Sequence, residues 1–196
     1  IGLLKSDDFG SSFKRLGDGP VLGRSTSDPF LVGSPRVKRF GPTWFMHYSS
    51  GTKWIPAPQR AEPVYKIRSA TSNDGIQWQP TGRNLVDDVL GEDECQASPE
   101  VFMVGSTFVM LFSYRRALEY KAGLGQYKIG MAISSDLVEW NRCDDDMQFR
   151  REGQEWMSES VSYPSIISVG KKLHLLFQGN GMGESGFGLA DLQVIE

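Results

Sequence analysis

The sequence has little cysteine and no excess of charge of one sign. Its 196 residues include two cysteines, Cys95 and Cys143, too few for a disulfide scaffold at this size, which predicts two reduced thiols. Lys and Arg number 21 against 24 Asp and Glu, so no basic stripe indicates a nucleic-acid partner. No apolar run reaches the roughly 18 residues of a membrane span, so we expect no membrane partner.

Metal-binding and targeting signatures are missing too. His47 and His174 lie far from each other and from both cysteines, so no metal-ligand spacing is present and we expect no cofactor. The chain begins at Ile1, with neither an initiator methionine nor a signal-peptide pattern, so we expect the natural start to lie upstream. The sequence therefore gives no compartment, and a cytoplasmic location is a working expectation.

Glycine, proline and aromatic residues are plentiful, with 22 Gly, 10 Pro, 11 Phe, 6 Tyr and 5 Trp. Short apolar segments with rough alternation are separated by Gly, Asn, Asp or Ser, which is the pattern of strands joined by turns. No segment has a sustained helical period with caps. The sequence predicts an all-β fold with almost no helix.

An internal repeat organises the chain. Pro35, Pro99 and Pro164 recur at intervals of 64 and 65 residues, and residues 65–78 match residues 127–140. Four strands per copy at this period indicate the blades of a β-propeller. We expect a single, partial propeller domain over residues 1–196. Its parts are the back half of a blade (1–26), two blades (27–86 and 87–150) and the last blade (151–196).

A turn motif recurs within the repeat. Asp74 and Asp136 each lie two residues after a serine and four residues before a tryptophan, a position where a carboxylate accepts backbone N–H bonds of a turn. We interpret both as architectural, because a residue repeated on an outer hairpin lies far from the axis. Asp7 and Asp8 have the same interpretation.

With its repeats aligned, the chain resembles the five-bladed β-propeller glycosidases, the group that includes glycoside hydrolase families 43 and 32. It also resembles propellers whose genes lie among polysaccharide genes, in which the last blade starts with Tyr-Pro and carries a glycine-rich turn. Here these are Tyr163-Pro164 and residues 180–188. The resemblance implies about three and a half four-stranded blades of a five-bladed ring. It also implies acids on the innermost strands facing the axis, the first of them upstream of this chain.

Three acids precede first strands and are the candidate catalytic residues: Asp28, Glu94 and Glu159. Glycoside hydrolysis needs two carboxyl groups across the scissile bond. One of Glu94 or Glu159 would be the general acid, with the partner base from missing blades. The alternative for each acid is a solvated loop position. Their offsets differ, and enzymes of the two families keep the acid closer to the following proline.

Several other side chains are candidates for holding a polyhydroxy ligand. Arg68 interrupts an apolar strand, which predicts a buried carboxylate partner or an anionic ligand. Trp54 and Trp156 fall in expected loops, where they could stack on sugar rings. The alternatives are a core role for a strand histidine and turn formation for the asparagine. The candidates are His47, Trp54, Arg68, Arg115, Trp156, Gln178 and Asn180.

The sequence thus predicts a glycoside hydrolase-like protein that acts on or binds oligosaccharide or polysaccharide, with carbohydrate as its partner. The alternatives are a non-catalytic carbohydrate-binding propeller and a protein-interaction propeller, since fold does not fix function. No protein metal site is predicted, although an axial ion occurs in some related propellers. An open arc would leave strand edges unpaired, so we expect the chain alone to associate into homo-oligomers.

Overall fold

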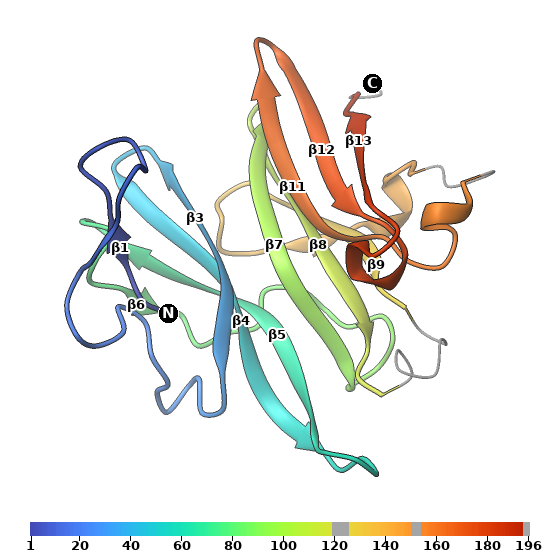
Figure 1. The fold of residues 1–196 in the computed structure, drawn as a ribbon, viewed down its shortest axis with the longest axis horizontal. Coiled ribbons are helices and arrows are strands. Elements are labelled where there is room, and N and C mark those ends of the chain that lie inside the picture. The colour runs from blue at the N-terminus through green and yellow to red at the C-terminus, as the bar shows by residue number, and fades with distance from the viewer. Residues whose placement is uncertain (119–125, 150–153, 194–196) are drawn as a thin grey trace.

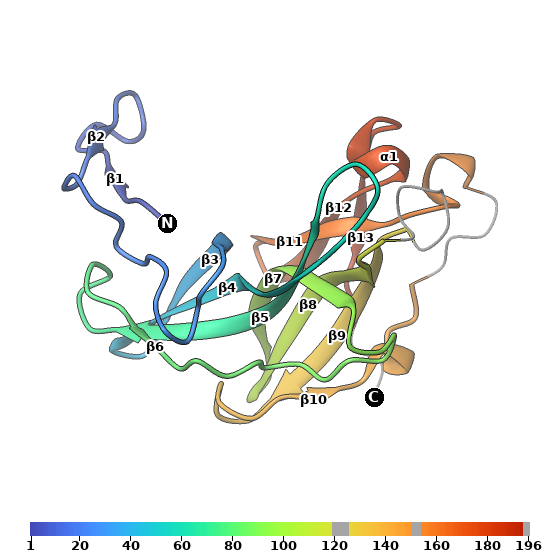
Figure 2. The same ribbon diagram turned by 90° about the horizontal axis from the view of Figure 1, so that it is seen from below.

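Antiparallel β-sheets make up the protein in the computed structural model, which describes residues 1–118, 126–149 and 154–193. The all-β prediction is confirmed. A two-stranded hairpin at the N-terminus pairs β1 (Leu4–Lys5) with β2 (Lys14–Arg15). Three larger sheets follow in chain order, each with its strands in sequence order. The N-terminal hairpin and the last sheet lie at opposite ends of the row (Figures 1 and 2).

The larger sheets are named here by their order in the chain. The first sheet contains β3 (Val32–Phe40), β4 (Thr43–Ile55), β5 (Glu62–Ser72) and β6 (Gln79–Pro80). The second contains β7 (Glu94–Val104), β8 (Thr107–Arg116), β9 (Lys128–Ser134) and β10 (Asn141–Arg142). The third contains β11 (Ser162–Val169), β12 (Lys172–Gln178) and β13 (Phe187–Asp191).

Helical structure is slight in the described residues, as predicted. Two short 3₁₀ turns are present, η2 (Asp144–Asp146) and η3 (Glu155–Met157). The one α-helical segment, α1 (Asn180–Gly183), contains left-handed φ values at Gly181 and Met182, so it is a tight turn rather than a regular helix. The connections between strands are therefore turns and extended segments.

The core is repeated from sheet to sheet. Residues opposite each other in antiparallel strands point to the same face, and each sheet has one apolar row at the same register position. On this face the second sheet packs against the first sheet, and the third sheet packs against the second. The rows are Val37, Met46 and Ala70 in the first sheet, Val101, Met110 and Ala132 in the second, and Ile166, Leu175 and Ala190 in the third.

A β-bulge recurs near the start of each first strand. Ser34, Ser98 and Tyr163, each directly before a proline, have φ values of 49°, 51° and 54°. The strand register shifts at the same three places. A bulge bends its strand and re-aims the residues before it. The repeated prolines of the sequence therefore mark a repeated distortion where the innermost strands begin.

The predicted turn aspartates have architectural contacts. Asp74 Oδ1 accepts the backbone N–H groups of Ile76 and Gln77, both at 2.8 Å. Asp136 Oδ1 does the same for the N–H groups of Val138 and Glu139. In the N-terminal hairpin this position belongs to Asp8, which accepts from the backbone and hydroxyl of Ser12. Asp7 instead forms an exposed ion pair with Lys5.

The first strands of the three sheets, β3, β7 and β11, start close to the neighbouring sheet, and in Figure 1 β3 and β7 start at the lower end while β11 starts higher, at the right. We call the region around these three strand starts the strand-start rim. It consists of segments 25–31, 87–93 and 154–161, which lead into these strands, with loops 56–61 and 179–186. Hydrogen bonds tie it across sheets: Ser49 Oγ donates to the carbonyl of Gln96 at 3.5 Å, and the Tyr163 N–H donates to Ser113 Oγ at 2.7 Å.

Candidate functional site

The candidate acid Asp28 is a fully buried carboxylate with an arginine partner. Arg68 Nη1 lies 3.2 Å from Asp28 Oδ1, and the Tyr48 hydroxyl donates to both carboxylate oxygens at 3.3 and 3.2 Å. Arg68 also donates from Nε to the side chain of Asn84. Burial, followed by the negative charge of Asp28, raises the pKa of Tyr48. Asp28 and Arg68 thus form one internal ion pair that fixes the segment before β3.

Glu94, at the start of β7, is held in the same way. It is fully buried, and Arg142 Nη1 lies 2.6 Å from Glu94 Oε1. The other oxygen accepts the backbone N–H groups of Val89 and Leu90, both at 2.9 Å, and Gln96 Nε2 donates to Oε1. Both carboxylate oxygens of Glu94 are thus bonded within the protein. Its geometry is that of an anchor for the segment leading into β7.

Glu159 differs from the other two acids because its side chain is exposed. Its backbone N–H donates to Asn180 Oδ1 at 2.9 Å, which places it beside α1 on the strand-start rim. In the described part of the chain no hydrogen bond or ion pair joins Asp28, Glu94 and Glu159 to one another. The structure therefore places two of the predicted acids in internal ion pairs and leaves one facing solvent.

His47 is buried in the middle of β4 rather than placed at a ligand site. Its ring meets that of Trp140 edge to face, with centroids 6.0 Å apart. Burial, followed by the positive charge of Lys38, lowers the pKa of His47 to about 4. Within the described residues, neither His47 Nε2 nor Trp140 Nε1 has a hydrogen-bond partner. This is the core position that the sequence left open as the alternative.

Arg115 lies in a cluster of tyrosines under the strand-start rim. Its Nη2 donates to the Tyr65 hydroxyl at 2.9 Å, and its guanidinium lies 4.9 Å from the ring centre of Tyr127. The hydroxyls of Tyr65 and Tyr127 are 2.6 Å apart, and the ring of Tyr163 is 5.7 Å from that of Tyr127. Burial is the main cause that raises the pKa of Tyr65. The cluster joins all three sheets.

These tyrosines were not among the sequence candidates, although a signal for two of them was present. Tyr65 and Tyr127 occupy the same position in two copies of the repeat. The sequence could not show that equivalent residues of adjacent sheets meet through their hydroxyls. Tyr163 carries the bulge of β11, so it connects this cluster to the strand start.

The two candidate tryptophans have different environments. Trp54 lies in β4, not in a loop, and 47% of it is exposed. Trp156 lies in η3 and stacks on Phe177 with ring centres 5.7 Å apart and planes at 20°. A Cβ added at Gly179 would be 2.5 Å from Trp156, so the backbone closely covers this ring. Trp156 is therefore a packing residue, and the loop prediction for Trp54 was wrong.

The last two candidates lie beside α1. Asn180 forms the turn: its Oδ1 accepts the N–H groups of Glu159 and Ser160, and its Nδ2 donates to the carbonyl of Glu155. Gln178 ends β12, opposite Ser162 and Phe187 in the register of the third sheet. The oxygen and the nitrogen of the Asn180 side-chain amide are thus both hydrogen-bonded within the protein. Gln178 is half-buried at the edge of the rim.

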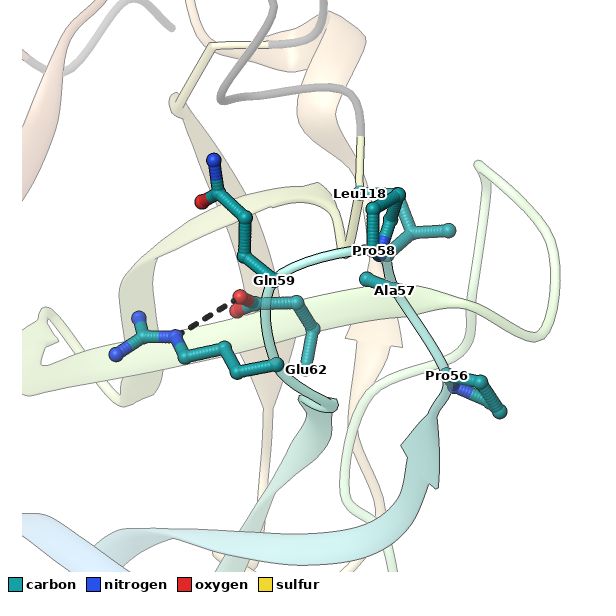
Figure 3. Close-up of a pocket in the computed structure, with 7 residues that line it drawn as sticks. Pro56, Ala57, Pro58, Gln59, Glu62 and Leu118 are labelled. Carbon is teal, nitrogen blue, oxygen red and sulfur yellow. Dashed lines mark hydrogen bonds and ion pairs between the residues drawn. The ribbon is translucent and has the colours of Figure 1, made fainter.

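The strand-start rim contains an open pocket with a volume of about 340 Å³ (Figure 3). Its walls are the tip of the β4–β5 hairpin and the residue that follows Ala117. Two of the lining residues form an ion pair, between Arg60 Nε and Glu62 Oε1 at 3.1 Å, drawn as a dashed line in Figure 3. The sequence analysis identified none of its residues. The pocket is lined by Pro56, Ala57, Pro58, Gln59, Arg60, Glu62 and Leu118.

Metal ligands, thiols and membrane-spanning helices are the remaining features of the described residues that bear on function. No group of three or more His, Cys, Asp and Glu side chains there could hold a metal ion. Cys95 and Cys143 are unpaired, and burial raises the pKa of the Cys95 thiol. Among the helices of the described segments, none has the length and apolar character needed to cross a membrane.

Comparisons with known proteins place this geometry in a fold class. No protein-family profile matches the chain. The chain is 29% identical over 193 residues to Uncharacterized protein Rv1502 of Mycobacterium tuberculosis, covering 98% of this chain and 61% of that protein. The chain thus spans less than two thirds of the length of this relative.

Solved structures define the class more directly. A thermostable family-43 glycoside hydrolase superposes with a TM-score of 0.73 at 14% identity, covering 100% of this chain and 64% of that enzyme. The GH32 β-fructofuranosidase BmSUC1 of Bombyx mori gives a TM-score of 0.66 at 18% identity, covering 99% of this chain and 41% of that chain. The protein has the fold of the β-propeller glycoside hydrolases, which confirms the structural side of the resemblance. At these identities the likeness concerns the fold alone.

Proposed function

We propose that this chain belongs to a glycoside hydrolase-like propeller that binds oligosaccharide or polysaccharide at the strand-start rim. The observation that carries this proposal is the superposition of the whole chain on a family-43 glycoside hydrolase. The open pocket at residues 56–62 supports it, because proline rings and an Arg–Glu pair together offer apolar contact and hydrogen bonding to a sugar. We also propose that the three sheets are blades of a five-bladed ring.

For hydrolysis we assign the general acid to Glu159. Asp28 and Glu94 are sealed in ion pairs with Arg68 and Arg142, so neither can readily exchange a proton with a substrate. Glu159 is exposed at the start of a first strand. A glycosidase needs a second carboxylate across the bond. In this proposal that group comes from a part of the protein outside this chain.

Non-catalytic carbohydrate binding is the second candidate function. The observation that favours it is the burial of both Asp28 and Glu94 in internal pairs, which leaves one of the three predicted acids open to solvent. Such a protein would use the same rim to hold a glycan without breaking it. Trp54, which is exposed on β4, would then be a stacking residue.

The test uses the protein at its natural length with a panel of oligosaccharides. Binding is measured by calorimetry, and hydrolysis by chromatography of the products. For a hydrolase, Glu159→Gln removes product formation and leaves binding, whereas Glu139→Gln, at an exposed outer turn away from the rim, changes neither. Binding without products from the natural protein would favour the second candidate. Failure to bind any member of the panel would contradict both.

A further inference from the structure

The main chain around Glu159 is fixed by the side chain of Asn180. Asn180 Oδ1 accepts the N–H groups of Glu159 and Ser160 at 2.9 and 3.0 Å, and its Nδ2 donates to the carbonyl of Glu155 at 2.8 Å. One amide thus bonds to both ends of the segment from residue 155 to residue 160. Ser160 Oγ adds a bond to the carbonyl of Gly179 at 3.3 Å. The backbone of Glu159 is therefore held against the turn that follows β12.

The turn that presents Asn180 has an unusual backbone. Residues 181–183 have φ values of 65°, 57° and 95°, and the second of them is Met182, which has a side chain. Such a conformation costs about 1–3 kcal/mol for a residue other than glycine and persists only where the surrounding contacts fix it. One of these contacts is made by Ser185, whose Oγ donates to the carbonyl of Trp156 at 2.7 Å. The turn is thus bonded to the segment of Glu159 at a further point.

The other two acids are held in the opposite way. Asp28 and Glu94 are bonded through their carboxylates, to Arg68 and Arg142 respectively. Glu159 is bonded through its N–H, and its exposed carboxylate has no hydrogen bond or ion pair within the described residues. The third sheet therefore fixes the main chain of its acid and leaves the carboxyl group open to a ligand.

An aromatic residue of the second strand explains why this acid has no arginine partner. Phe112 and Phe177 occupy the same register position in the second and third sheets, each opposite a glycine. The guanidinium of Arg142 lies 5.0 Å from the ring centre of Phe112. Over Phe177 the corresponding place is taken by the indole of Trp156, with ring centres 5.7 Å apart. An uncharged ring thus replaces the cation that pairs with the acid in the second sheet.

We propose that Asn180 is a positioning residue for Glu159, holding its main chain so that the carboxyl group meets the glycosidic oxygen of a bound glycan. This inference rests on the hydrolysis proposed above. In that step the proton leaves the Glu159 carboxyl group for the leaving-group oxygen, which keeps the electron pair of the breaking glycosidic bond. The second carboxylate, from outside this chain, or the water that it activates, bonds to the anomeric carbon. Asn180 itself exchanges no proton.

The test compares two kinds of substrate in the protein at its natural length. The oligosaccharides that it cleaves have leaving groups that need a proton, whereas dinitrophenyl glycosides of the same sugars have leaving groups that need none. Asn180→Ala should lower kcat for the oligosaccharides about 100-fold, because a misplaced acid is costly, and leave KM within about threefold. With the dinitrophenyl glycosides the loss should stay below about fivefold. Asn73→Ala, at an exposed outer turn, is the matched control and should change neither rate.

Two further variants separate positioning from folding. Asn180→Asp keeps an oxygen that can accept both N–H groups, so its kcat should stay within about tenfold of that of the unsubstituted protein. Ser185→Ala removes the bond of the turn to the Trp156 carbonyl and should cause a smaller loss with the same selectivity for oligosaccharides. If Asn180→Ala does not fold, Ser185→Ala decides the result.

An unchanged kcat for Asn180→Ala would overturn the inference. An equal loss with both kinds of substrate would do the same, since a general structural role affects both, and so would an Asn180→Asp protein as slow as Asn180→Ala. A natural-length protein that cleaves none of the glycans would instead overturn the proposed hydrolysis, and this inference with it. That outcome is seen in the unsubstituted protein, so the two failures are distinguishable.

Discussion

Two buried carboxylates determine how the strand starts are held, and each depends on one arginine. Asp28 with Arg68 and Glu94 with Arg142 are ion pairs whose members are almost fully removed from water. Such pairs are costly to break from one side, because the remaining charge stays buried without its partner. Residues that sequence analysis assigns to catalysis can therefore act in architecture when an arginine reaches them from another strand.

The first prediction concerns the Asp28–Arg68 pair. Arg68→Met should lower the free energy of unfolding by about 3–5 kcal/mol, because Asp28 would remain buried without its ion-pair partner. Asp28→Asn together with Arg68→Met should cost less than the sum of the two single changes. Urea denaturation of the four proteins measures this coupling. Additive losses would show that the two side chains do not stabilise each other.

The second prediction concerns the pH dependence of stability through His47. The pKa of His47 is about 4 in the folded protein, and the ordinary value is 6.5. Between these two values the unfolded chain binds a proton that the folded protein does not, so stability falls as the pH is lowered through this range. At 1.36 kcal/mol per pKa unit, the loss is up to about 3 kcal/mol.

Denaturation curves at several pH values check this contribution. His47→Gln should flatten the slope of stability against pH between about 6.5 and 4. His174→Gln is the natural control, since the chain has only these two histidines. An unchanged slope in His47→Gln would mean that His47 binds its proton equally well in the folded and the unfolded protein, which contradicts the prediction.

At the scale of strands and turns, much of the arrangement follows from local signals. The prolines at positions 35, 99 and 164 mark the innermost strands, and the turn aspartates mark the outer hairpins. Both signals are local, because the bulge and the turn each depend on residues within a few positions of the proline or the aspartate. Trp54 shows where local signals stop, because the long β4–β5 hairpin extends past the expected end of its strand.

The site was less predictable because its contacts join distant residues. Arg142 reaches Glu94 across 48 positions, and Tyr65 meets Tyr127 across 62. Nothing in the composition near Glu94 indicates which arginine will approach it. The expectation that Asp28, Glu94 and Glu159 face the axis rested on their position before three first strands. In the described residues, the first two turn instead toward partners on β5 and β10.

The third prediction tests the bulge before each proline. Ser98 has a φ of 51°, a region that glycine adopts freely and β-branched residues avoid. Ser98→Gly should therefore keep the stability within about 1 kcal/mol, whereas Ser98→Val should lower it by about 1–3 kcal/mol. Urea denaturation compares the two variants. A Ser98→Val protein as stable as Ser98→Gly would contradict a bulge that requires positive φ.

At the scale of the whole molecule, the sheets are packed in a row with one face of the last sheet exposed. The fourth prediction is that Leu189→Asp has opposite effects in two proteins. It should reduce self-association of the 196-residue chain, because it adds charge to an exposed apolar face. It should destabilise the protein at natural length, where the proposed five-bladed ring covers that face.

Light scattering of the short chain and thermal unfolding of the long one measure the two effects. Val138→Asp, on an outer turn, is the control and should change neither property. If Leu189→Asp changed neither the association of the short chain nor the stability of the long one, the role given to this face would be contradicted.

The N-terminal segment has a consequence for polymerisation. It covers the face of the first sheet that carries Met46 and Ala70, whereas the face of the third sheet that carries Phe187 and Leu189 is exposed. A chain without its first 22 residues would carry both halves of a head-to-tail contact. Such heterologous contacts grow into filaments when their rotation does not close a ring. We therefore expect Ile1 and Leu22, which pack on Met46 and Ala70, to keep the first sheet from binding the exposed face of another molecule.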